Sequence, residues 1–230
     1  MFRTLVSSVA SRVRSVARRR RAQIFHDNFV LDASSKVLDI GSEDGSNIAQ
    51  VLLGTGLQPH NVYIADISED MVTSGHEKYG FVPVTISEAG RLPFDNGYFE
   101  VVYCSSVIEH VTVPKEHVWL VTSGEKFRRT ANERQLAFAQ EIRRLGRGYY
   151  VQTPNRWFPI ESHTWLPFVG YLPRAWQISV LHICNRFWVK RTNPDWHLLT
   201  ARDMRRLFPG AAIVKERFFG LTKSIMAIKR

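Results

Sequence analysis

The fold is decided by the stretch Val37-Leu38-Asp39-Ile40-Gly41-Ser42-Glu43-Asp44-Gly45-Ser46. Its apolar start predicts a buried strand over 37–40, and its two glycines predict a loop that lets the main chain approach a ligand closely. A helix is expected over 46–53, with its free N–H groups facing whatever lies over the loop. This arrangement is typical of a pocket for a nucleoside cofactor.

The next apolar segment, 62–67, ends in an acid, Asp66. A carboxylate at the end of the second strand can accept hydrogen bonds from both hydroxyls of a ribose. A nicotinamide fingerprint needs Gly-x-Gly-x-x-Gly, whereas Glu43 stands two residues after Gly41 and Ser46 follows Gly45. The spacing therefore disfavours NAD without excluding it.

Strand and helix patterns alternate along the rest of the chain, which predicts parallel strands joined by right-handed helical crossovers. Ser68 and Thr200 are expected N-caps. The expected strands are 37–40, 62–67, 82–86, 101–105, 149–152, 212–218 and 224–228, and the expected helices are 46–53, 69–79, 132–145 and 204–208.

Three further segments occur in the order in which one enzyme family carries them: Leu92-Pro93-Phe94 with Phe99-Glu100-Val101-Val102, then Ser106-Val107-Ile108-Glu109-His110-Val111, then Tyr149-Tyr150-Val151-Gln152-Thr153-Pro154-Asn155. With the glycine loop, they make the chain resemble the class I S-adenosylmethionine-dependent methyltransferases over residues 36–229. The likeness is strongest to the small-molecule, type 11-like group. It implies a Rossmann-like α/β fold with a seven-stranded, mostly parallel sheet, an antiparallel last strand and helices on both faces.

The resemblance also implies a set of residues that bind S-adenosyl-L-methionine. Glu43 replaces the middle glycine of the family loop, where its charge either weakens cofactor binding or pairs with the ammonium group of the methionine moiety. Polar sequence over 114–134, before Leu145-Gly146-Arg147-Gly148, is expected to be an insertion at the rim. The implied cofactor residues are Asp39, Gly41, Glu43 and Gly45 in the loop, Asp66 and Ile67 at the ribose, Glu88 and Ala89 at the adenine, and Ser105 at the methyl-transfer site.

Methyl transfer from a sulfonium mainly requires alignment of the acceptor and exclusion of water. A hydroxyl acceptor also gains from a base, and histidine is the natural one near neutral pH. His110, after the fourth predicted strand, and His163, with Glu161 beside it, are the two candidate bases; Glu109 is a candidate for substrate binding or helix capping. No residue is assigned to a metal.

The segment 154–194 breaks the alternation and is rich in Trp, Phe, Pro and His. It reads either as a packed excursion or as an aromatic acceptor pocket, and both can hold together. The Asn/Asp-Pro-Pro-aromatic tetrad of enzymes that methylate nucleic-acid bases is absent after the fourth predicted strand, where Cys104-Ser105-Ser106-Val107 stands. This favours a small-molecule, sugar or lipid-linked acceptor.

At 230 residues, one catalytic domain over 27–230 is the default, preceded by a basic amphipathic helix over 1–26. Seven of the 31 basic residues precede the first acid, Asp27, and the nearly balanced remainder disfavours nucleic acid as a partner. Three interpretations of the N-terminal segment remain open. It covers the cofactor as a lid, it contacts an anionic membrane peripherally through residues 1–21, or it is a transit peptide. Two cysteines favour a reducing compartment, hence a cytoplasmic protein, which is membrane-associated if the N-terminal segment contacts lipid.

The leading hypothesis is an O-methyltransferase. An N-methyltransferase acting on tRNA or protein, with the arginine arm as a tether, is the second, and a scaffold in which Glu43 prevents cofactor binding is the third.

Overall fold

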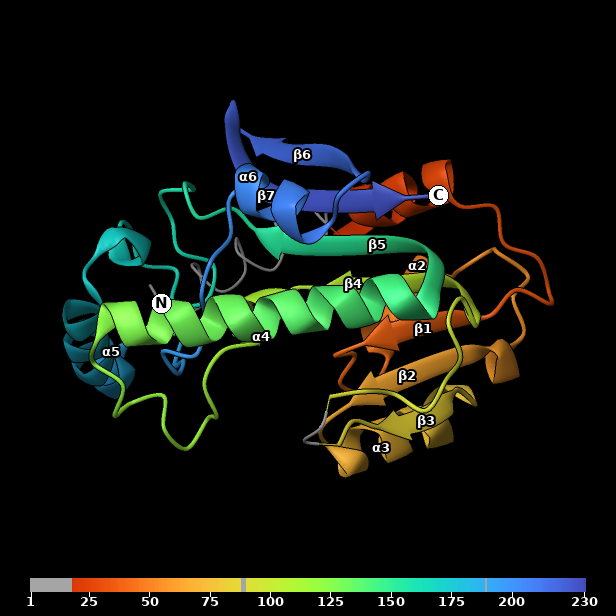
Figure 1. The fold of residues 1–230 in the computed structure, drawn as a ribbon, viewed down its shortest axis with the longest axis horizontal. Helices are drawn as coiled ribbons and strands as arrows, with labels where there is room; N and C mark the ends of the chain where they lie inside the picture. Colours follow the sequence, from red (N-terminus) through yellow and green to blue (C-terminus); the bar gives the residue numbers. More distant parts are fainter. Residues whose placement is uncertain (1–17, 88–89, 189) are drawn as a thin grey trace. The chain divides into compact units, whose positions relative to one another are not determined.

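A computed structural model describes residues 18–87, 90–188 and 190–230. Its strands form one seven-stranded sheet of order β3-β2-β1-β4-β5-β7-β6, mostly parallel with antiparallel last strands, as Figure 1 shows. This confirms the predicted Rossmann-like fold. The strands are β1 Val37–Ile40, β2 Val62–Asp66, β3 Val82–Thr85, β4 Phe99–Ser105, β5 Gly146–Pro154, β6 Ala212–Phe218 and β7 Leu221–Lys229.

The chain divides into two compact units. The first holds the described residues up to Ser105, with Glu141–Val151 and Ile228–Arg230; the second holds Ser106–Gln140 and Gln152–Ala227. In the first unit, β1 pairs in parallel with β2 and β4, and β2 pairs with β3. The register sets Ile40 opposite Ala65, so the loop that leaves β1 starts beside the end of β2.

Two helices of the first unit follow these strands. α2 (Ser46–Val51) is shorter than the predicted 46–53, whereas α3 (Glu69–Tyr79) has the predicted bounds and packs against β2 and β3. A short 3-10 helix, η1 (Pro59–Asn61), leads into β2. Ser68 is the N-cap residue of α3, but its side chain makes no capping hydrogen bond.

The N-terminal part of the described chain is a helix over residues 18–28. Phe25 is fully buried in the first unit, with its ring edge-on to Tyr103 at 5.7 Å and to Tyr150 at 5.9 Å between centroids. The boundary predicted between residues 26 and 27 therefore falls inside a helix. Most of the amphipathic pattern, residues 1–17, lies outside the described residues, so its three interpretations stay predictions.

The helix predicted over 132–145 is longer than expected, because α4 runs from Gly124 to Leu145. The segment expected to be a polar insertion, 114–134, is therefore helical from Gly124 onward. Phe127, Ala131 and Gln135 recur every four residues and are buried, at 4%, 0% and 1% exposure. A stripe with one aromatic, one alanine and one amide is too weakly apolar to reveal a helix by its pattern.

The fifth strand, predicted over 149–152, is longer than expected, because β5 begins at Gly146, directly after α4. A Cβ on Gly146 would come within 2.9 Å of Val102 Cγ2 on β4. The glycine therefore allows close packing of two strands rather than a turn.

The segment 154–194 is more regular than expected. It contains η3 (Val169–Tyr171) and α5 (Arg174–Phe187), a 14-residue helix. The predicted cap at Thr200 is confirmed: in α6 (Ala201–Leu207) the Thr200 side chain accepts from the N–H of Asp203, whose carboxylate accepts from the N–H of Thr200. Among the described residues, no helix combines the length and the apolar composition needed to cross a membrane.

Candidate functional site

The loop after β1 holds three residues with positive φ within five positions, Gly41 at 76°, Glu43 at 52° and Gly45 at 70°. The Gly41 N–H donates to the carbonyl of Ala65 at 2.7 Å, which fixes the loop to the end of β2. A Cβ on Gly45 would lie 3.0 Å from Ile64 Cγ2. Glu43 is exposed, and its positive φ is a backbone conformation that favours glycine.

The carboxylate of Asp66 accepts hydrogen bonds from backbone N–H groups, one of them in this loop. Its Oδ2 accepts the N–H of Glu43 at 3.0 Å, and its Oδ1 accepts the N–H of Ser68 at 3.1 Å. A carboxylate offers about four acceptor positions, so two remain for the hydroxyls of a ribose. The sequence predicted only the ligand-binding role.

Asp39 is buried, at 3% exposure, and its Oδ2 has no hydrogen-bond partner among the described residues. Burial, with a further contribution from the charge of Asp66, raises the pKa of Asp39 well above its usual value. A buried carboxyl group without a partner is costly unless a ligand satisfies it. The ammonium group of a methionine moiety has the charge and the hydrogen atoms to do so.

The remaining predicted cofactor residues differ in how they lie. Ile67 is exposed, at 65%, and Ser105 is half-buried at the end of β4, where it hydrogen-bonds the hydroxyl of Tyr103. Burial is the main cause that raises the pKa of Tyr103 to about 12, so this hydroxyl stays protonated. Glu88 and Ala89 lie outside the described residues. The structure therefore joins Glu43 to Asp66 directly and Gly41 to Ala65, the neighbour of Asp66, and the charge of Asp66 acts on Asp39.

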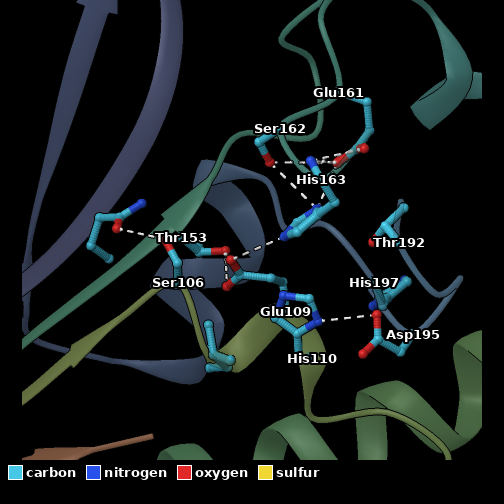
Figure 2. A network of polar contacts seen from close by, with 12 residues as sticks. Ser106, Glu109, His110, Thr153, Glu161, Ser162, His163, Thr192, Asp195 and His197 are labelled. Atoms are coloured by element: carbon cyan, nitrogen blue, oxygen red, sulfur yellow. Dashed lines mark hydrogen bonds and ion pairs between the residues drawn. The ribbon is translucent and has the colours of Figure 1, made fainter. Parts of the chain in front are cut away.

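The second unit contains a buried polar network around His163, which Figure 2 shows. His163 Nδ1 lies 2.6 Å from Glu161 Oε1, and its Nε2 lies 3.7 Å from Glu109 Oε1. Burial lowers the pKa of His163, but the hydrogen bonds and charges of Glu109 and Glu161 outweigh it and raise this pKa to about 9. A histidine that already carries a proton at neutral pH is poorly suited to accept one.

His110 lies in η2 (Ile108–His110) and meets the ring of His163 edge-on, with 4.6 Å between centroids. Its Nδ1 lies 3.2 Å from Asp195 Oδ1. Burial raises the pKa of Asp195, but its hydrogen bond with His110 outweighs this and lowers that pKa. Of the two predicted bases, His110 has the arrangement of an oriented general base, an imidazole held by a carboxylate on one nitrogen.

Sequence reasoning missed three members of this network. Thr153 donates to Glu109 Oε2 at 2.9 Å, and Trp196 stacks on His163 with 5.7 Å between centroids and 13° between planes. Asp195 was missed too. These residues lie more than thirty positions from their partners and carry no motif, so the sequence held no signal that pairs them.

A cavity of about 300 Å³ lies in the second unit, beside this network. Arg128, Arg156 and Arg174 line it together with Tyr171 and Trp196. The aromatic acceptor pocket predicted for 154–194 differs from this cavity, because five of the eight Trp, Phe and Tyr rings in that segment are exposed, and of the eight only Tyr171 lines the cavity. The exposed rings are Trp157, Phe168, Tyr171, Trp176 and Phe187. The cavity combines flat apolar rings with cationic groups.

Residues 38–122 match the family model described as a methyltransferase domain. This range includes the β1 loop, Asp66, Glu109 and His110. With the strand order of the sheet, the match shows that the chain has the fold of the class I methyltransferases. No curated protein matches the sequence.

Solved structures share this fold at low identity. A SAM-dependent methyltransferase from Aquifex aeolicus is 13% identical, with 90% of this chain and 87% of that chain covered and a TM-score of 0.51. The trans-methyltransferase CalH, in complex with SAH, is 16% identical over 84% of this chain and 50% of its own, with a TM-score of 0.50. A Rhodobacter sphaeroides protein, provisionally described as a zinc-dependent alcohol dehydrogenase, is 13% identical over 91% and 87%, with a TM-score of 0.58. These likenesses concern the fold alone.

Proposed function

We propose that this protein transfers a methyl group from S-adenosyl-L-methionine to a hydroxyl of a small-molecule, sugar or lipid-linked acceptor. The observation that carries the proposal is the first-unit loop, in which Asp66 binds the backbone of Glu43 and a buried Asp39 is left unpartnered. A nicotinamide cofactor fits less well, because Glu43 and Ser46 occupy positions where its fingerprint has glycine.

The bound cofactor would supply an electrophilic methyl group on sulfur. The acceptor oxygen would form a bond to the methyl carbon as the carbon–sulfur bond breaks, with the electron pair remaining on sulfur. His110 would take the hydroxyl proton on Nε2, because its Nδ1 faces Asp195. Such a base adds about 10²–10⁴-fold.

The cavity of the second unit supports an acceptor with two kinds of group. Its rings suit an apolar or sugar face, and its three arginines suit a phosphate or carboxylate. Trp196 both lines the cavity and stacks on His163, so an acceptor there would lie near the histidine pair.

Calorimetry with S-adenosylmethionine and S-adenosylhomocysteine tests the proposal. Heat of binding in the wild type, weakened in Asp66→Asn and unchanged in the exposed-loop control Asp95→Asn, is expected. Absence of heat in the wild type at high protein concentration would refute it. Mass spectrometry of cell extracts incubated with labelled cofactor would then identify the acceptor by a gain of one methyl group.

One observation favours a second candidate, a scaffold that does not bind the cofactor: Glu43 keeps the left-handed backbone of a glycine position. If its side chain blocks the site, Glu43→Gly should bind S-adenosylhomocysteine where the wild type does not. Equal binding by both would remove this candidate.

A further inference from the structure

Three side chains of the second unit point ligand atoms at one place. One nitrogen or oxygen from each of Glu109, His110 and His163 lies within 4.8 Å of the other two. Glu109 is fully buried, and Thr153 holds its Oε2, whereas its Oε1 has no hydrogen-bond partner. This buried carboxylate oxygen faces two imidazoles, and its ion pair with His163 Nε2, at 3.7 Å, is too long for a hydrogen bond, so a cation bound between these groups would satisfy it better.

Both imidazoles are held from behind in the same way. Asp195 lies 3.2 Å from Nδ1 of His110, and Glu161 lies 2.6 Å from Nδ1 of His163. Once a metal ion displaces the Nε2 proton of His163, each ring keeps its proton on Nδ1 and presents the lone pair of Nε2 toward the shared place. This carboxylate–histidine pattern is the one that orients metal-ligating histidines.

Glu161 is itself held firmly. Its Oε2 accepts the backbone N–H groups of His163 at 2.9 Å and Thr164 at 2.7 Å, and the residue is 2% exposed. Figure 2 shows the carboxylate on the far side of the His163 ring from Glu109. The orientation of His163 is therefore set by groups outside the candidate site.

Distance and charge fit a small divalent ion. Two ligands on a tetrahedral ion with bonds of about 2.0–2.1 Å stand about 3.3 Å apart, and His163 Nε2 lies 3.7 Å from Glu109 Oε1. The three ligand atoms lie within 4.8 Å of one another, so side-chain rotations would have to move them by at most about 1.5 Å to reach that spacing. The three carboxylates, Glu109, Glu161 and Asp195, carry more negative charge than the proton on His163 neutralises, and a divalent ion that displaces this proton would neutralise the excess.

We propose that Glu109, His110 and His163 bind a divalent transition metal of the zinc type, with Asp195 and Glu161 as outer partners. Two imidazoles and one carboxylate suit zinc or ferrous iron and leave a coordination position open. A water or a hydroxyl oxygen can occupy that position. If the proposed function holds, an acceptor hydroxyl bound there would ionise more readily, and the metal would replace His110 as the group that activates it, because the Nε2 of His110 would bind the metal. This role rests on the proposed function, whereas metal binding does not.

The test is calorimetric titration of Zn²⁺ into the full chain, purified without a histidine tag and stripped with a chelator. One tight site per chain is expected. Glu109→Gln and His163→Gln should abolish it, and the exposed His60→Ala should retain it. Tight binding that survives both ligand substitutions, or no tight binding in folded wild type, would overturn the proposal.

The outer carboxylates give a graded readout. Asp195→Asn and Glu161→Gln should each weaken Zn²⁺ by about 10–100-fold without changing the stoichiometry. Unchanged affinity in both would count against the assignment of their histidines. These measurements need no S-adenosylmethionine, so a failure of the methyl-transfer proposal leaves their outcome interpretable.

A wild-type measurement guards against variants that fail to fold, which far-ultraviolet circular dichroism would reveal. Co²⁺ bound at this site should give two exchangeable hyperfine-shifted proton signals, from the Nδ1–H groups of His110 and His163. Both groups are shielded by their carboxylates and should exchange slowly enough to be seen. Absence of both signals in the Co²⁺-loaded chain would refute ligation by this pair.

Discussion

The carboxyl group of Asp39 is expected to destabilise the ligand-free protein. Its pKa is raised by burial and by Asp66, whereas the unfolded chain has the usual value near 3.8. Between these two values the folded chain holds a proton that the unfolded chain releases, so stability falls as pH rises through this window. Below it, both states are protonated and the effect disappears.

Asp39→Asn removes the titration and keeps the shape. Its amide stays a buried polar group, so the substitution removes only the cost of ionisation, which is on the order of 1–3 kcal/mol for a buried carboxyl group. Relief of this amount would raise the melting temperature by about 2–12 °C near pH 8, since 1 kcal/mol corresponds to about 2–4 °C at this chain length. The gain should shrink as pH approaches 4.

Differential scanning fluorimetry across pH 4–8 measures this directly. Asp44→Asn is the matched control, because the hydrogen bond from Ser46 lowers the pKa of Asp44, and its loss should destabilise slightly at neutral pH. Saturating S-adenosylhomocysteine should stabilise the wild type by about 2.7 kcal/mol at a hundred times its Kd, and stabilise Asp39→Asn less. An Asp39→Asn variant that melts at or below the wild type at pH 8, or gains equally at every pH, would refute the reasoning.

Other predictions concern single packing features. Gly45→Ala should lower the free energy of unfolding in urea by about 2–3 kcal/mol, because the residue has a positive φ and the new Cβ would lie 3.0 Å from Ile64 Cγ2. Gly54→Ala should cost only about 1–2 kcal/mol, because its φ is 83° but no atom lies within 4 Å of the new Cβ. Equal losses would show that the contact with Ile64 contributes nothing. Thr200→Ala should cost about 1 kcal/mol through its capping box, and an unchanged urea midpoint would disprove that role. Arg174→Met should cost about 2–4 kcal/mol, because the buried guanidinium donates to the Val118 carbonyl at 2.8 Å; a neutral result would show that this bond is dispensable. Deletion of residues 1–21 should abolish binding to anionic vesicles in sedimentation assays while keeping cofactor affinity, and undiminished vesicle binding would exclude the membrane interpretation.

The sheet and the β1 loop could be predicted because their signals are local. Buried parallel strands read as short apolar runs, and glycine at positions 41 and 45 marks a backbone that few other residues adopt. The first turns of α4 could not be predicted, because Gly124 starts a helix whose buried stripe is only weakly apolar. Burial in the folded protein stabilises the first turns of α4, although their sequence pattern alone does not predict a helix.

The roles of the histidines in the polar network of the second unit could not be predicted from the sequence either. His110 and His163 were each recognisable as candidate bases, but their separate roles follow from partners far along the chain: Asp195 for one, Glu109 for the other. An imidazole with a carboxylate on one side and a free nitrogen on the other can accept a proton or a metal ion, whereas one between two carboxylates holds a cation. Because the same two rings face one unpartnered carboxylate oxygen, whether a proton or a metal ion occupies this place decides which chemistry the second unit can perform. The Zn²⁺ titration and the methyl-transfer assay therefore need to be made on the same preparation.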